Sequence, residues 1–283
     1  SKCYTKFMSF NHLSDAEIKE ALALRERLDL LKKQEICKTN FLEFIDHMWD
    51  GFICGRHHKI FAEKLEGIAN GTIKRLIVNM PPRHTKSEFA STYFPAWIMG
   101  RDPSRKIMQT THTGELAVRF GRKVRNMMDS DIYKQIFPEV HLSSDSKSAG
   151  RWETNKSGEY FAAGVGGAIT GRGADLLIID DPHSEQDAMS PTAMESCWEW
   201  YTSGPRQRLQ PGGSIVLVMT RWSGIDLTAK LLEAQKEALA DQWEIVEFPA
   251  IFPETENPLW EEFWSLEELL KVKASLPVMK WNA

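Results

Sequence analysis

Cysteine is scarce in this 283-residue sequence, which contains four, widely spaced and without a C-x-x-C pair. This spacing argues against a disulfide framework or a four-thiolate zinc site, and it favours a reducing compartment. The sequence also lacks an apolar run approaching the roughly 18 residues of a membrane span, and its N-terminus lacks the apolar stretch of a signal peptide. We therefore expect a globular protein that stays where it is made and has no membrane partner.

Basic residues are not in excess, because 35 Lys and Arg face 39 Asp and Glu and leave a net charge of −4. This balance argues against a chain that wraps nucleic acid over its whole surface, so any such contact must be local. Potential metal ligands gather at His47, Cys54, His57 and His58, but their spacing matches no common ligand pattern. A helix end with polar side chains is the favoured interpretation, and a metal site is the alternative.

The first seventy residues have helical patterns. Ser14 to Glu17 form a capping-box signature that predicts a helix to about Ile36. Two further helices are expected at FLEFIDHMW and HHKIFAEKLEGIA, the second ended by Asn70 and Gly71. With 42% hydrophobic residues and no repeat or low-complexity tract, the chain can bury one large core or two modest ones.

From Ile73 onward, short β-rich runs alternate with helical stretches, a pattern typical of an α/β fold with a parallel sheet. The runs at 176–179 and 215–219 are apolar on consecutive residues, as expected for strands that are covered on both faces. Two further runs, 151–155 and 159–164, predict a small β-hairpin insertion. Five central strands are expected, at 73–79, 105–111, 174–180, 214–220 and 243–248.

The stretch LIVNMPPRHTKSEFA, residues 76 to 90, has the order of a strand, a phosphate-binding loop and a helix. Laid on G-x-x-x-x-G-K-[ST], it keeps Lys86 and Ser87 but has Met80 and Thr85 where the two glycines belong. Thr85 can still supply its backbone N–H, although a β-branched residue is costly if the loop requires a positive φ there. An ordinary strand-to-helix turn with a surface lysine remains the alternative for this stretch alone.

A second motif supports the first. LLIIDDP, residues 176 to 182, ends a buried strand with Asp180 and Asp181, at the strand end where ligands bind in open α/β sheets. Asp180 could hold a Mg²⁺ ion that bridges two phosphates, and Asp181 could polarise the attacking water. A helix cap or a turn is the alternative. The next strand ends in Thr220 and Arg221, which could sense the γ-phosphate or simply end the strand.

Three stretches taken together, MPPRHTKSE, TGRGADLLIIDDP and RLQPGGSIVLVMTRW, closely resemble the ATPase domain of bacteriophage terminase large subunits. The resemblance covers about residues 40 to 283. It implies a P-loop NTPase fold of the additional-strand class, in which the fourth strand lies between the first and the third. Family members commonly have Pro-Pro-Arg-His-Gly-Lys-Ser in the loop, so Thr85 replaces a glycine here.

The resemblance also assigns roles to residues. It implies an ATP-binding loop, a Mg²⁺ site at Ser87 and Asp180, and Asp181 in the place of the catalytic Glu of many relatives. Arg172 is the candidate for an arginine that reaches a neighbouring subunit's ATP, with a loop arginine that bridges carboxylates as the alternative. Thr220 and Arg221 match the family's coupling motif. The loop comprises Pro82, Arg83, His84, Thr85, Lys86 and Ser87, with Lys86 also in a catalytic role.

The activity implied is ATP hydrolysis that drives double-stranded DNA into a procapsid. The implied partners are further copies of the chain in a ring, five by family resemblance, a portal protein and a small terminase subunit, in the host cytoplasm and transiently at the portal. We expect a helical region at 1–70, an ATPase core at 71–250 and an extension at 251–283. That extension would lead toward an RNase H-like nuclease domain, whose activity is not expected from this chain alone.

Ring motors hold the phosphate backbone of DNA with Lys and Arg. In TGELAVRFGRKVRNMM, an apolar face formed by Leu116, Phe120, Val124 and Met127 leaves three arginines on other faces. Arg119, Arg122 and Arg125 are therefore candidates for contact with DNA or a neighbouring subunit, and a solvated face is the alternative. Two other functions remain open: a helicase-like DNA-dependent ATPase, and a non-catalytic nucleotide-binding assembly module.

Overall fold

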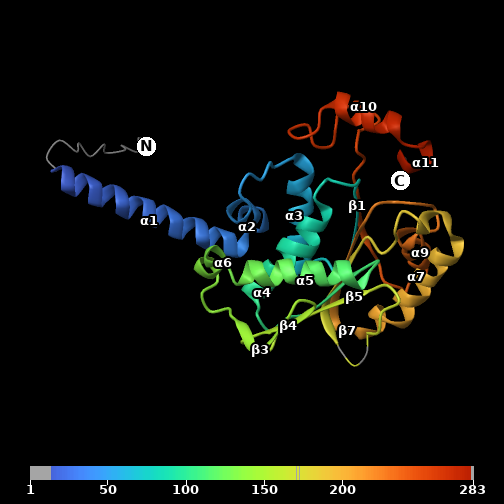
Figure 1. Ribbon diagram of the computed structural model, residues 1–283, viewed down its shortest axis with the longest axis horizontal. Helices are drawn as coiled ribbons and strands as arrows, with labels where there is room; N and C mark the ends of the chain where they lie inside the picture. The colour runs from blue at the N-terminus through green and yellow to red at the C-terminus, as the bar shows by residue number, and fades with distance from the viewer. Residues whose placement is uncertain (1–13, 170, 172, 282–283) are drawn as a thin grey trace.

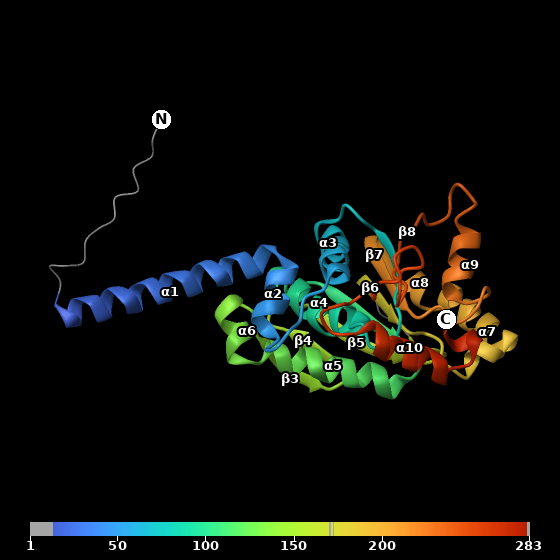
Figure 2. The ribbon, with the colours of Figure 1, turned by 90° about the horizontal axis from the view of Figure 1, so that it is seen from above.

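The structure is a computed structural model that describes residues 14–169, 171 and 173–281. Its centre is one eight-stranded sheet with helices on both faces, and a long N-terminal helix extends away from this body (Figures 1 and 2). The strand order is β3-β4-β5-β2-β6-β7-β1-β8. The expected α/β class, with its helical N-terminal region, is therefore confirmed.

Five parallel strands, which run side by side from β2 to the edge strand β8, form at the places that the sequence predicts. The fourth of them in chain order, β7, lies between β1 and β6 and pairs in parallel with both. This is the strand order expected for the additional-strand class. The five are β1 (Arg75–Asn79), β2 (Lys106–Thr111), β6 (Ala174–Asp180), β7 (Leu209–Met219) and β8 (Glu244–Glu247).

The expectation of a five-stranded sheet with a separate hairpin is wrong in one respect. The hairpin of β4 (Arg151–Thr154) and β5 (Glu159–Gly164) does form, but β5 also pairs in parallel with β2 along its whole length. β3 (Leu142–Ser148) then pairs with β4, which brings the sheet to eight strands. The edge of β2 would otherwise leave backbone groups unpaired, and β5 satisfies them.

Alternate residues of the central strands pack into two separate cores. In β7, Val216 and Val218 face a core formed with α2 to α6, and Ile215 and Leu217 face a second core formed with α7 and α9. This two-sided burial explains the consecutive apolar residues of β6 and β7. The helices on the two faces are α3 (Arg56–Asn70), α4 (Phe94–Arg101), α5 (Gly114–Met128) and α6 (Asp131–Ile136), opposite α7 (Pro191–Ser203) and α9 (Leu227–Ala234).

The N-terminal helices begin and end at the predicted signals. The capping box of Ser14 and Glu17 opens α1 (Asp15–Thr39), whose last turn buries Cys37 in the core. α2 (Phe41–Met48) follows, and α3 ends at Gly71, whose φ of 82° is in the left-handed region that favours glycine. Among the described residues, no helix combines the length and apolar character that a membrane crossing requires.

Shorter elements complete the chain. A π-helix, η1 (Glu88–Tyr93), leads directly into α4, so that the helix after the loop contains one wide turn. Ser265 caps the last long helix, α10 (Leu266–Ser275), whose residues line a pocket together with residues that follow β1 and β8. The others are a 3₁₀ turn, η2 (Asp187–Met189), with α8 (Pro205–Arg208) and α11 (Val278–Trp281).

Candidate active site at the carboxyl edge of the sheet

The loop between β1 and η1 has two residues with left-handed backbone conformation, although neither of them is glycine. Thr85 has a φ of 70° and Arg83 a φ of 60°, both in the left-handed region. The strain that the sequence analysis associated with a β-branched residue at this position is therefore present. Lys86, the next residue, is 7% exposed, so its ammonium lies inside the site. Pro82 and Arg83 are exposed.

Asp180 at the end of β6 lies beneath the first turn after the loop. The hydroxyl of Ser87 donates to its Oδ1 at 2.9 Å, and the hydroxyl of Ser91 donates to its Oδ2 at 2.7 Å. Gln109 of β2 donates in turn to the Ser91 hydroxyl at 2.9 Å. The two serines lie four residues apart, where the π-helix begins, so both reach the same carboxyl group.

Burial dominates the electrostatics of Asp180, which is 2% exposed. Burial, followed by the neighbouring negative charge of Asp181, raises the pKa of Asp180 to about 7, although Lys86 and the two serine hydroxyls oppose this shift. A carboxyl group with a raised pKa binds a proton or a cation readily near neutral pH. The site therefore favours a positive ligand next to Asp180.

Asp181 turns the other way and contacts the loop lysine. Its backbone has a φ of 41°, and its Oδ2 lies 2.9 Å from the Lys86 ammonium. Its Oδ1 accepts a hydrogen bond from the backbone N–H of Thr220 at 2.8 Å. The adjacent carboxylates thus face different partners. Lys86 therefore lies beside the acid pair at the end of β6, and the roles of these residues toward a nucleotide stay predictions.

The two coupling candidates separate in space. Thr220 is 2% exposed, and its hydroxyl donates to the Met80 carbonyl oxygen at 3.2 Å, which ties the end of β7 to the start of the loop. Arg221 instead extends toward Asp226, at 3.0 Å, and Glu247, at 3.1 Å. Thr220 therefore belongs to the site, whereas Arg221 braces the turn before α9.

A cluster of aromatic rings supports the loop from the N-terminal side. His58 Nε2 lies 2.7 Å from the Thr85 hydroxyl, and the rings of His57 and His58 pack against Trp260, which lies between β8 and α10. Burial lowers the pKa of His57 to about 4 and that of His58 further still. Trp264 stacks on His84 in the same cluster.

The four potential metal ligands around residue 50 do not form a metal site. Within the part of the chain that the structure describes, no group of three or more His, Cys, Asp or Glu residues could hold a metal ion. His57 and His58 instead occupy the first turn of α3, in agreement with the polar helix end that their spacing favoured.

The implied magnesium ion fits the residues at the end of β6. Ser87 and Asp180 present a hydroxyl and a carboxylate oxygen side by side, and oxygen donors are the ligands that Mg²⁺ prefers. Magnesium in nucleotide sites takes its remaining ligands from phosphates and water, so a full protein cage is not required. The raised pKa of Asp180 agrees with a carboxyl group placed to meet a cation.

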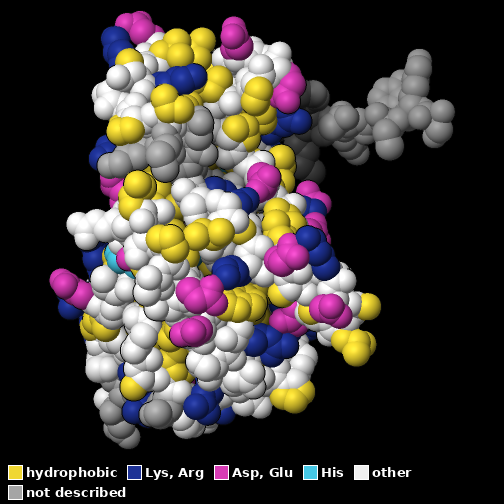
Figure 3. Space-filling view, turned by 90° about the vertical axis from the view of Figure 1, so that its right-hand side faces the viewer, with side chains coloured by type: hydrophobic (Ala, Val, Ile, Leu, Met, Phe, Trp, Pro, Cys, Tyr) yellow, Lys and Arg dark blue, Asp and Glu magenta, His cyan; other side chains and the backbone are white. Residues whose placement is uncertain are grey.

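The arginines proposed to contact ATP, DNA or a neighbouring subunit differ in exposure, and one of them is not described by the structure. Arg172 lies outside the described residues. Arg119 and Arg122 are exposed on α5, and Arg125 is partly buried and donates to Asn126. α5 buries Phe120 and Val124, as its predicted apolar face requires, but Met128 is buried more completely than Met127. On the side viewed in Figure 3, basic and acidic side chains are interspersed.

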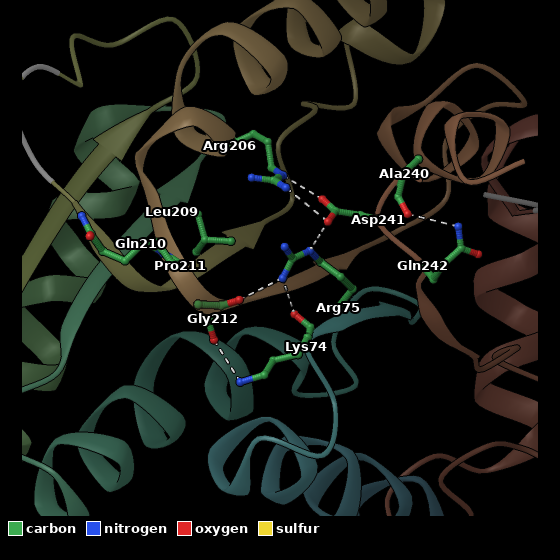
Figure 4. A pocket seen from close by; sticks show the side chains of 11 residues that line it. Lys74, Arg75, Arg206, Leu209, Gln210, Pro211, Gly212, Ala240, Asp241 and Gln242 are labelled. Carbon is green, nitrogen blue, oxygen red and sulfur yellow. Dashed lines mark hydrogen bonds and ion pairs between the residues drawn. The ribbon is translucent and has the colours of Figure 1, made fainter. Parts of the chain in front are cut away.

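A pocket of about 480 Å³ lies at the opposite edge of the sheet, where β1, β7 and β8 begin (Figure 4). Asp241 projects between two arginines: its carboxylate lies 2.9 Å from Arg75 Nε and 2.7 Å from Arg206 Nε. Lys74 donates to the Gly212 carbonyl oxygen at 2.9 Å. These contacts join the starts of three strands, far from the carboxyl edge where Lys86 and Asp180 lie.

Several residues of the site have no signal in the sequence. Four of them contact residues that are distant along the chain: Ser91, Gln109, His58 and Trp260. His112, at the end of β2, donates to the Asp181 carbonyl oxygen at 3.2 Å. Its position directly after a central strand is the single signal that could have indicated it, because the carboxyl ends of parallel strands share one edge.

Comparison with known proteins finds one sequence relative and solved structures of similar fold. No family model matches the chain. A terminase large subunit of Enterobacteria phage T3 is 26% identical over 165 residues, which cover 57% of this chain and 28% of that protein. The large terminase of bacteriophage HK97 superposes with a TM-score of 0.52 at 14% identity, over 82% of this chain and 49% of that one.

A further solved structure matches this fold over nearly its whole length. The large terminase ATPase domain of Thermus phage P74-26, in a variant form, superposes with a TM-score of 0.51 at 14% identity, over 85% of this chain and 95% of that domain. The fold is that of a large terminase ATPase domain. The resemblance to terminase large subunits is thus confirmed in sequence and in fold. The chain spans less than a third of its T3 relative and about half of the HK97 large terminase, but it matches nearly the whole of the P74-26 terminase ATPase domain.

Proposed function

We propose that this chain hydrolyses ATP and is the motor domain of a terminase large subunit that moves double-stranded DNA into a procapsid. The observation that carries the proposal is the meeting of Lys86, Ser87, Asp180 and Asp181 at the carboxyl edge of a sheet with the additional-strand order. A lysine, a hydroxyl and two carboxylates are the groups that phosphoryl transfer to water requires.

Lys86 would exchange partners when a triphosphate binds. Its ammonium would leave Asp181 and contact the β- and γ-phosphates, while the backbone N–H groups of residues 83–87 point at the phosphate oxygens. Ser87 and Asp180 would hold Mg²⁺, which supplies positive charge to the phosphate oxygens when it is bound. The strained backbone at Arg83 and Thr85 is what curves the loop for these contacts.

Asp181 would then accept a hydrogen bond from the attacking water. The exchange at Lys86 frees its Oδ2, while the Thr220 N–H continues to hold its Oδ1 and so keeps the carboxylate oriented. Because aspartate is one methylene shorter than the glutamate of many relatives, the water must lie closer to the end of β6. In this arrangement Thr220 is the residue best placed to transmit hydrolysis to the rest of β7.

Phosphate release from the purified chain with Mg²⁺ and ATP tests the proposal. Lys86→Ala is expected to lower the rate by at least roughly 100-fold, because it removes a cation from the transition state. Lys74→Ala is the matched control: this lysine lies at the other end of β1, and the rate should not change. Equal background from the wild type, Lys86→Ala and Asp181→Asn would contradict an ATPase and favour a nucleotide-binding assembly module.

The partners of a terminase belong to the same proposal: double-stranded DNA, a homo-oligomeric ring, a portal protein and a small terminase subunit, all in the host cytoplasm. Stimulation of ATPase activity by DNA tests the first of them, with Arg119→Ala and Arg122→Ala reducing the stimulation. Within a ring, Arg172 would reach the neighbour's ATP. Mixing Asp181→Asn subunits with Arg172→Ala subunits should restore activity at high concentration, and no recovery would contradict the role in trans.

A further inference from the structure

His58 makes two hydrogen bonds that fix both its tautomer and its charge. The backbone N–H of Gly55 donates to its Nδ1 at 2.8 Å, so that nitrogen carries no proton. The proton of the neutral ring is then on Nε2, which lies 2.7 Å from the Thr85 hydroxyl and donates to it. The hydroxyl donates in turn to the His84 carbonyl oxygen at 2.5 Å. The Gly55 backbone thus begins a directed chain that ends in the loop.

Thr85, which takes part in this chain of hydrogen bonds, departs from the usual loop sequence. Thr85 stands where a phosphate-binding loop has glycine, and its φ of 70° is a conformation that a β-branched residue rarely adopts. Glycine adopts it without strain. A threonine needs a partner that holds it there, and the hydroxyl provides the attachment point that glycine lacks.

We propose that His58 is a positioning residue of the phosphate-binding loop, whose Nε2–H holds Thr85 in the left-handed conformation that glycine would adopt unaided. His58 and Thr85 therefore act as a pair that replaces the loop glycine. The inference rests on the proposed function, because it assigns the pair to the nucleotide site.

The surroundings of His58 suit this role. Its ring stacks on Phe89, at 4.9 Å between centroids and 18° between planes, and meets Trp260 edge to face at 4.9 Å and 87°. Both His58 and Phe89 are fully buried. Because the ring is packed on two sides and water is excluded, its Nε2–H has one orientation and the Thr85 hydroxyl as its acceptor.

A double-mutant cycle tests the pair. In the wild-type background, His58→Phe keeps a ring but removes the donor, and the affinity for a non-hydrolysable ATP analogue should fall by roughly three- to tenfold. In the Thr85→Gly background the same change should alter affinity less than about twofold, since glycine needs no support. His58→Gln, which keeps a side-chain N–H near the place of Nε2, should restore most of the affinity.

His57→Phe is the matched control. His57 is equally buried, but the Thr85 hydroxyl has its histidine contact with His58. Its replacement should weaken binding by the same small factor in the wild-type loop and in the Thr85→Gly loop. If His58→Phe also lowers affinity by one factor in both backgrounds, His58 merely packs, and the proposal is overturned.

Two readouts do not need ATP. Nitrogen-15 NMR of the His58 ring should show the Nε2–H tautomer, and an Nδ1–H tautomer would overturn the proposal. The same cycle can be measured on the free energy of unfolding, where His58→Phe should destabilise the wild-type background more than the Thr85→Gly background. A wild-type chain that fails to bind nucleotide would contradict the proposed function, and these two measurements would still decide the role of His58.

Discussion

Lys86 and Asp181 form an ion pair, 2.9 Å from Nζ to Oδ2, that joins the loop between β1 and η1 to the end of β6. The Lys86 side chain is 8% exposed and that of Asp181 28%, so the pair is only partly screened by solvent. In the proposed function, a triphosphate would compete with Asp181 for this ammonium. The carboxylate would then be available to water only when Lys86 contacts the phosphates.

Asp181→Asn should separate binding from hydrolysis. The amide cannot accept a proton from water, so we expect hydrolysis to fall by roughly 10²- to 10⁴-fold. Affinity for a non-hydrolysable ATP analogue should stay equal or rise, because Lys86 loses its competing anion. Single-turnover phosphate release and fluorescence titration measure the two effects. Asp175→Asn, at the other end of β6, is the control, and a parallel loss of binding and hydrolysis in Asp181→Asn would contradict the competition.

Asp180 should make stability depend on pH. Because its pKa is raised from 3.8 to about 7, the folded chain retains a proton that the unfolded chain releases, so this group lowers stability as pH rises from about 4 to about 7. The buried histidines act in the opposite direction, since burial lowers the pKa of His57 to about 4. The contribution of Asp180 therefore has to be isolated by comparison with a variant.

The comparison is between the wild type and Asp180→Asn, without added Mg²⁺ or nucleotide. The free-energy difference in favour of the variant should grow between about pH 5 and pH 7, on the order of 1 kcal/mol for each pH unit, and level off above about pH 7. Urea unfolding at each pH measures it. A difference that stays constant with pH would show that the pKa of Asp180 is not raised.

The sequence predicts those parts of the site that depend on a short motif at the end of a parallel strand. Asp180 and Asp181 follow a run of apolar residues, and the carboxyl ends of parallel strands share one edge, so their meeting with Lys86 could be expected before any coordinates. The position of β7 between β1 and β6 came instead from the family resemblance. The helix cap at Ser14 was predicted because a capping box depends on residues three positions apart.

The remaining features depend on contacts between distant segments. His58 reaches Thr85 across 27 residues, and no local pattern encodes that hydrogen bond. β5 joins the sheet because β2 offers an edge, and this pairing is a property of the folded chain rather than of EYFAAG. The wide turn of η1 likewise accompanies the packing of Phe89 and the bond from Ser91 to Asp180. Each of these three features depends on tertiary packing rather than on local sequence.

Trp260 should stabilise the loop from outside. It is 5% exposed and contacts the rings of His57, His58 and His84. Trp260→Ala is expected to lower the free energy of unfolding by about 3 kcal/mol, because it leaves a cavity in a buried aromatic cluster. Phe263→Ala, whose ring is 51% exposed, should cost less than about 1 kcal/mol and serves as the control. Equal losses for the two variants would contradict a special role for Trp260.

Asp241 should be a structural anchor without a role in nucleotide binding. Its carboxylate lies between Arg75, whose side chain is 12% exposed, and Arg206, whose side chain is 36% exposed. Asp241→Ala leaves two guanidinium groups side by side without an anion, and we expect a loss of roughly 1 to 3 kcal/mol in the free energy of unfolding. Arg206→Ala should cost less, because Arg75 then keeps Asp241 as its partner. Chemical denaturation measures both.

These residues lie at the opposite edge of the sheet from Lys86. The affinity of the folded Asp241→Ala and Arg206→Ala variants for ATP analogues should therefore equal that of the wild type. A loss of affinity of about tenfold would show that the two edges are coupled through β1 and β7.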